Sequence, residues 1–198
     1  MNSLIYWLSQ MVGSFALGQI LDSSKLRRKH RAMIGWVITL IFVFAVWGGT
    51  YHVQTTFERL PPKTPHYLTD VYSSEYGGLA VLYACMGLLD SITQCFTYWL
   101  FSAMSNDMAK LAHYVGFYKS IQSAGASVAF SVDGRGNVPY MNELAASWAL
   151  NAGGLLFALP VVLMRVKDTT AVEGEKTVEG REKEIEEINH KVLAERQG

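Results

Sequence analysis

The chain has 198 residues, half of them hydrophobic, and long stretches carry no charged side chain. That length would suit one ordinary soluble domain, but uncharged apolar stretches of this kind indicate an integral membrane protein instead. The 17 basic and 17 acidic residues balance, so the net charge gives no indication of a nucleic-acid partner.

Five stretches are long and apolar enough to cross a bilayer core of about 30 Å as helices. They are residues 1–21, 32–51, 77–101, 108–131 and 142–164. The predicted fold is therefore all-α, a polytopic transmembrane helix bundle of about five spans that occupies residues 1–164. Its first partner is the lipid bilayer.

Residues 165–198 hold 16 of the 34 formal charges. We expect this segment to be a charged cytoplasmic tail that is partly helical or disordered. A short coiled-coil contact with a partner is the alternative, because Ile185, Ile188 and Val192 recur there at helical spacing.

Basic residues predict the orientation of the spans. The loop after the first stretch, DSSKLRRKHR, contains Lys25, Arg27, Arg28, Lys29 and Arg31. Counted near the spans, eight basic residues fall on the side of this loop and three on the other. Cytoplasmic loops carry the excess of lysine and arginine. The prediction is an outer N-terminus and a cytoplasmic C-terminus.

No pattern of reactive or metal-ligating residues is recognisable. The five histidines are scattered without ligand spacing, so we assign no metal site and no cofactor. Cys85 and Cys95 lie about 15 Å apart along one predicted helix and cannot pair with each other. We expect no enzyme activity.

Polar residues inside the third stretch follow helical spacing. They are Tyr83, Asp90, Gln94, Thr97 and Tyr98, with Gly87 in the same row. The row recurs every three to four positions, with Thr97 and Tyr98 adjacent at its end, and therefore lies on one helix face. A charged side chain at the bilayer centre costs at least about 2.5 kcal/mol, so such residues usually face the bundle interior. Two interpretations stay open for Asp90. It is a buried acid that holds helices together, or it belongs to a substrate or coupling site with Gln94 and Tyr98.

The fourth stretch offers a partner for this acid. Lys119 lies about 16 Å from one end of its predicted span, and Asp90 lies about 20 Å from the opposite end of its own. Because these depths nearly match, we expect an ion pair between them. Gln122 is either a packing contact or part of a cavity wall. The stretches at 32–51 and 142–164 are almost uniformly apolar, and we expect them to face lipid.

Two levels of family resemblance follow from these residues. The loop GQILDSSKLRR resembles the loop signature of the major facilitator superfamily, with Gly18, Asp22, Arg27 and Arg28 in the signature positions at looser spacing. The segments YACMGLLDSITQCFTYW, SNDMAKLAHYVGFYKSIQSAG and WALNAGGLLFALPVVLMRVKD are similar to fungal membrane proteins related to the "uncoordinated" potassium-channel regulator, an offshoot of that superfamily. The resemblance extends from Asn2 to Thr169.

The family resemblance also implies where the five spans lie in a larger fold. The five spans would correspond to the last five of twelve helices, which is most of the C-terminal half of a major facilitator fold. The chain would then be the C-terminal part of a longer protein, with Asp90, Gln94 and Lys119 near a central cavity.

Two functions are expected on this basis. The first is a transporter-like carrier of an unidentified small solute or ion, with Asp90 and Lys119 at or near the coupling site. The alternative is a non-transporting regulatory or trafficking partner of another membrane protein, such as an ion channel. A fragment without a function of its own is a third possibility.

Overall fold

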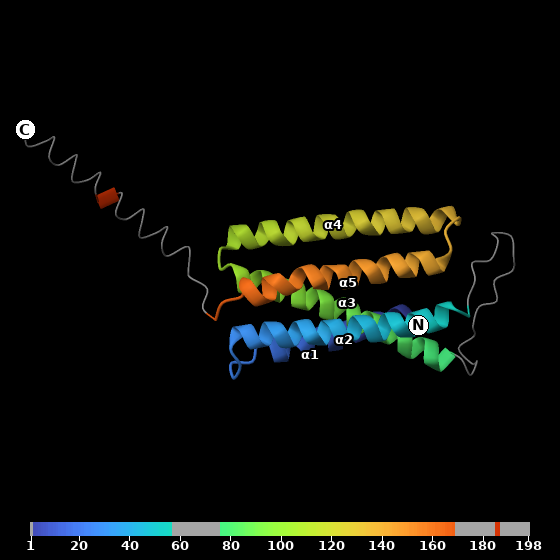
Figure 1. Ribbon diagram of the computed structural model, residues 1–198, viewed down its shortest axis with the longest axis horizontal. Coiled ribbons are helices and arrows are strands. Elements are labelled where there is room, and N and C mark those ends of the chain that lie inside the picture. The colour runs from blue at the N-terminus through green and yellow to red at the C-terminus, as the bar shows by residue number, and fades with distance from the viewer. Residues whose placement is uncertain (1, 57–75, 169–184, 187–198) are drawn as a thin grey trace, which may run out of the picture.

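A computed structural model describes residues 2–56, 76–168 and 185–186. In this part of the chain the structure consists of α-helices without a β-strand (Figure 1). The main helices are α1 (Asn2–Leu21), α2 (Arg28–Gln54), α3 (Tyr76–Met104), α4 (Met108–Arg135) and α5 (Tyr140–Met164). The predicted all-α bundle is confirmed. Most of the charged tail and the coiled-coil positions Ile188 and Val192 lie outside the described residues.

Four of these helices, α1, α2, α3 and α5, are long and apolar enough to cross a membrane. α4 has 28 residues but is not among the four. Its sequence contains two lysines, a histidine and four serines in addition to its apolar residues. The helix predicted at residues 108–131 is therefore present at its expected place, and that it spans the membrane stays a prediction.

The helices run alternately up and down the bundle, so that their loops gather at two ends (Figure 1). The α1–α2 loop, the α3–α4 connection and the end of α5 lie at one end. There the backbone N–H of Lys29 donates to Asp168 Oδ1 at 3.4 Å, and Arg31 Nη1 donates to the carbonyl of Leu21 at 2.7 Å. The basic loop and the end of α5 are thus neighbours. Which end faces the cytoplasm stays a prediction.

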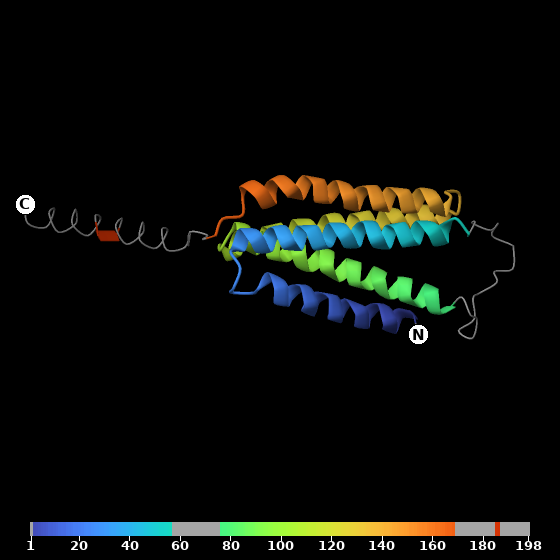
Figure 2. The same ribbon diagram turned by 60° about the horizontal axis from the view of Figure 1, so that its bottom comes forward.

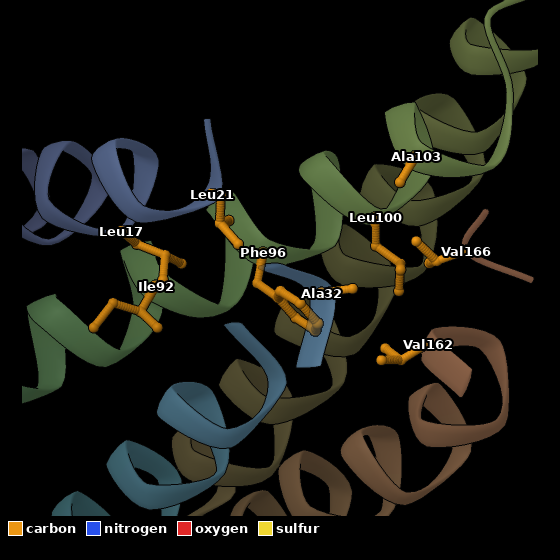
Figure 3. Close-up of a cluster of buried hydrophobic side chains, with 9 residues drawn as sticks. All are labelled: Leu17, Leu21, Ala32, Ile92, Phe96, Leu100, Ala103, Val162 and Val166. Atoms are coloured by element: carbon orange, nitrogen blue, oxygen red, sulfur yellow. The ribbon is translucent and has the colours of Figure 1, made fainter. Parts of the chain in front are cut away.

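A cluster of buried apolar side chains joins α1, α2, α3 and the end of α5 (Figure 3). Its members are Leu17, Leu21, Ala32, Ile92, Phe96, Leu100, Ala103, Val162 and Val166. α3 packs on α1, α2 and α4, whereas α5 packs mainly on α2. Figure 2 shows α1 along α3 on one side of the bundle and α5 on the opposite side of α2. These apolar contacts hold α3 against α1, α2 and the end of α5.

The two most apolar helices do not simply face lipid. α2 buries a row of residues spaced three to four apart, which are Ala32, Gly35, Thr39, Val43 and Val46. The indole Nε1 of Trp36 donates to the carbonyl of Leu155 on α5 at 2.9 Å. The expectation for residues 32–51 and 142–164 is therefore corrected, since one face of each helix packs inside the bundle. Composition could not reveal this, because lipid-facing and helix-facing side chains are equally apolar.

Two glycines let α1 and α3 approach closely. A Cβ atom on Gly87 of α3 would lie 2.6 Å from the carbonyl oxygen of Tyr6 and would also overlap Ser9 Oγ. A Cβ atom on Gly13 of α1 would overlap Ser91 Oγ. Small residues permit this kind of backbone approach between membrane helices. The close packing brings the first turns of α1 against the middle of α3.

We predict that alanine destabilises the protein at one helical glycine and not at another. Gly87→Ala lowers the free energy of unfolding by about 1–3 kcal/mol, because the added methyl group overpacks the α1–α3 contact. Gly48→Ala leaves stability unchanged or raises it by up to about 1 kcal/mol, because alanine favours the helix and its Cβ atom would have no neighbour within 4 Å. Thermal unfolding in detergent measures both. Equal stability of the two variants would contradict the close contact.

Candidate functional site

Asp90 lies in the middle of α3 and accepts hydrogen bonds from two helices. Tyr6 Oη and Gln10 Nε2 of α1 donate to its Oδ2 at 3.2 and 3.0 Å. Gln94 Nε2, one turn further along α3, donates to its Oδ1 at 3.1 Å. Tyr6 and Gln10 are four residues apart, so both lie on the face of α1 that meets α3. The acid thus faces the bundle, as its place in the polar stripe predicts.

Lys119 of α4 is held by uncharged groups. Its Nζ donates to Gln94 Oε1 at 2.8 Å and to Gln122 Oε1 at 2.7 Å. The same nitrogen lies 5.7 Å from the ring centroids of both Tyr98 and Tyr118. Those two rings meet edge to face with their centroids 5.7 Å apart. This group of side chains is the polar contact between α3 and α4.

The predicted ion pair between Asp90 and Lys119 is not a direct contact. Gln94 stands between them, with its Nε2 on the carboxylate and its Oε1 on the ammonium group. This orientation of the amide satisfies both charges. Lys119 Nζ thus contacts Gln94, one helical turn along α3 from Asp90, and not Asp90 itself. The charges remain coupled, but through an amide.

Two cavities lie along α3 and share one residue. The first has a volume of about 400 Å³. Its wall comes from all five helices and consists of Tyr6, Val46, Trp47, Met86, Leu89, Asp90, Thr93, Gln94, Tyr118, Gln122 and Asn151. The second has a volume of about 530 Å³ and is lined from α1 and α3 by Gln10, Ser14, Ser91, Gln94, Cys95, Tyr98, Trp99 and Ser102. Gln94 lines both, and the second cavity extends further toward the end of α3.

The structure brings most of the predicted site residues together. Asp90, Gln94, Lys119 and Gln122 form one chain of hydrogen bonds. Tyr98 joins it through its ring. We call these five residues, with Tyr6 and Gln10, the polar cluster.

The residues of the loop signature lie elsewhere. Gly18, Asp22, Arg27 and Arg28 are at the end of the bundle, around the loop between α1 and α2. The backbone N–H of Asp22 donates to the carbonyl of Gly18 at 2.9 Å and ends α1 there. These residues shape the loop and do not contribute to the polar cluster.

The sequence interpretation missed the contribution of α1. Tyr6 and Gln10 carry the same signal as the stripe on α3, because they are polar, lie four residues apart and stand in an apolar stretch. Trp47 and Asn151 were also missed as lining residues. A single tryptophan or asparagine in an apolar helix has no spacing that marks the side it faces.

The chain is similar to a group of fungal and plant membrane proteins. It is 40% identical over 171 residues to an UNC93-like protein of Schizosaccharomyces pombe, and the match covers 86% of this chain and 34% of that protein. It is 36% identical over 169 residues to the UNC93-like proteins 1 and 2 of Arabidopsis thaliana, covering 84% of this chain and 36% of each. The chain thus spans about a third of the length of these curated relatives. No family model and no solved structure matches it.

Four apolar helices of membrane-spanning length around a polar cluster define a multi-pass integral membrane protein. Within this class the chain belongs to the UNC93-like family. The resemblance that the sequence motifs indicated is confirmed.

We predict that Gln94 carries the coupling between the two charges. In a double-mutant cycle, Asp90→Asn and Lys119→Gln should show an interaction energy of about 0.5–3 kcal/mol. The interaction should vanish when the cycle is repeated with Gln94→Leu, which removes both of the bridging hydrogen bonds. Unfolding in detergent gives the energies.

Lys110→Gln, two and a half turns before Lys119 on α4, is the matched control and should show no coupling with Asp90→Asn. A cycle that keeps its full interaction energy after Gln94→Leu would contradict the bridge.

Proposed function

We propose that these helices form the solute-handling part of a transporter-like carrier of a small solute. The observation that supports this most is the place of Gln94. It lines both cavities and is hydrogen-bonded to Asp90 on one side and Lys119 on the other. Charged side chains at a cavity within membrane spans are typical of substrate and ion paths.

The proposed path runs along α3. A solute that passes from one cavity to the other moves past Gln94 and displaces its amide from Asp90 or Lys119. Asp90 Oδ1 then accepts a donor of the solute, or Lys119 Nζ donates to an acceptor of the solute, while Tyr6, Gln10 and Gln122 keep their hydrogen bonds. Occupancy of the path and the state of the two charges are thereby coupled, as a carrier requires.

We further propose the surroundings in which this path works. The matched relatives are about three times as long as the matched part, and α4 buries none of its residues against the helices described. In the proposed arrangement the five helices belong to the C-terminal half of a major facilitator fold, and α4 faces the other half. The N-terminus is placed outside and the C-terminus in the cytoplasm.

A second function is favoured by a different observation. Both carboxylate oxygens of Asp90 accept hydrogen bonds from protein side chains, as a structural acid in an apolar region needs. A protein that holds its helices together in this way, and presents the polar helix α4 to a partner, would be a non-transporting regulator of another membrane protein.

Uptake by reconstituted vesicles separates the two functions. We expect the full-length protein to take up at least one member of a labelled panel of amino acids, sugars, nucleosides, amines and monovalent cations. Asp90→Asn should reduce the initial rate about tenfold or more, because it removes the negative charge from the cavity wall on which the proposed path depends.

Asp168→Asn is the control, since Asp168 lies at the end of the bundle against Lys29, and it should keep the rate. Absence of uptake of every panel member, together with stable co-purification of a channel or receptor, would favour the regulator.

A further inference from the structure

We propose that the 400 Å³ cavity binds a small organic ammonium ion that carries a hydroxyl or carbonyl group. The proposal rests on the proposed function, because it names the class of solute for the cavity beside Asp90. It is carried by three features of the wall, which are its charge, its aromatic rings and one buried donor.

The charge of the wall is negative. Among the described residues that line the cavity, Asp90 is the only one of the types Asp, Glu, Lys, Arg and His. The donors on its carboxylate are a phenol and two amides, so no positive group neutralises it by direct contact. This charge attracts a cation, and the attraction is stronger at the part-buried carboxylate than it would be at a fully exposed one.

Three aromatic side chains line the same cavity as the acid. Tyr6, Trp47 and Tyr118 come from three different helices and all line the cavity. The face of such a ring attracts a cation within about 6 Å of its centroid, and quaternary ammonium ions are recognised in this way. The ammonium group of Lys119 already lies 5.7 Å from the Tyr118 centroid. The surroundings of the Tyr118 ring are therefore compatible with an ammonium group.

One hydrogen-bond donor in the wall lacks an acceptor. The indole Nε1 of Trp47 is buried and has no hydrogen-bond partner in the part of the chain that the structure describes. A buried donor without a partner is costly. A hydroxyl or carbonyl oxygen on the bound molecule would satisfy it, and this is why the proposed cation carries such a group.

The hydrogen bonds that Asp90 already accepts restrict the type of cation that fits the site. Its two oxygens already accept three hydrogen bonds, which leaves little room for additional N–H donors. A quaternary ammonium ion has no N–H group and needs no hydrogen-bond acceptor, because the negative charge and the ring faces hold it.

The cavity volume lies in the usual range for small-molecule sites.

Lys119 does not line the cavity, but its charge affects the affinity of the site for a cation. Its Nζ is held by Gln94 and Gln122, which both line the cavity. A positive charge so close opposes the binding of another cation. Loss of this charge should therefore strengthen the binding of an ammonium ion, whereas loss of the Asp90 charge should weaken it.

The test compares three probes in the full-length protein held in lipid nanodiscs. They are choline, tetramethylammonium and the uncharged carbon isostere of choline, in which a tert-butyl group replaces trimethylammonium. Isothermal titration calorimetry should show choline binding about tenfold or more tighter than its isostere. Asp90→Asn should weaken choline binding by a similar factor, and Lys119→Gln should tighten it several-fold.

Trp47→Phe separates the two halves of the ligand. It keeps an aromatic ring and removes the N–H donor, so choline binding should weaken about threefold or more, while tetramethylammonium binding should stay nearly constant. Phe157→Leu is the control, because Phe157 is 84% exposed on α5 and should leave every affinity unchanged.

The outcomes distinguish this proposal from the proposed function. Equal binding of choline and its isostere, or no choline binding by the folded protein, would overturn the ammonium site even if another solute is taken up. Asp90-dependent choline binding without any uptake would support the site and contradict the carrier.

Discussion

The polar cluster depends on the close packing of α1 against α3. Gly13 and Gly87 leave no room for a side chain where the two backbones meet, and this approach places Tyr6 and Gln10 on the carboxylate of Asp90. An acid in an apolar helix is tolerated where protein donors surround it. Without the α1 donors Asp90 would keep only the amide of its own helix, so the position of α1 decides what this acid can do.

Gln94 connects this anchored acid to the rest of the bundle. It joins the negative charge on α3 to the positive charge on α4, and it lines both cavities. The amide of Gln94 thus has the carboxylate of Asp90 on one side and the ammonium group of Lys119 on the other. The proposed carrier function and the proposed ammonium site both rest on this one arrangement, and the UNC93-like relatives are the proteins in which to look for it.

Hydropathy predicted the helices from their long apolar stretches. Helical spacing predicted that Asp90 faces the bundle, because residues three to four positions apart lie on one face of a helix. The amide bridge could not be predicted, because helical spacing does not tell which of two polar residues on the same face of α3, Asp90 or Gln94, Lys119 contacts. The buried face of α2 was missed because lipid and neighbouring helices select the same apolar residues. Tyr6 and Gln10 could have been found from their four-residue spacing, but their contact with Asp90 depends on where α1 packs.

A density map of the full-length protein in lipid nanodiscs, at a resolution that shows side chains, tests the central arrangement most directly. We predict that the Asp90 carboxylate lies within hydrogen-bond distance of Tyr6 Oη and Gln10 Nε2, and that the Gln94 amide stands between Asp90 and Lys119. A map in which Asp90 faces lipid, or in which Lys119 contacts the Asp90 carboxylate directly, would contradict it.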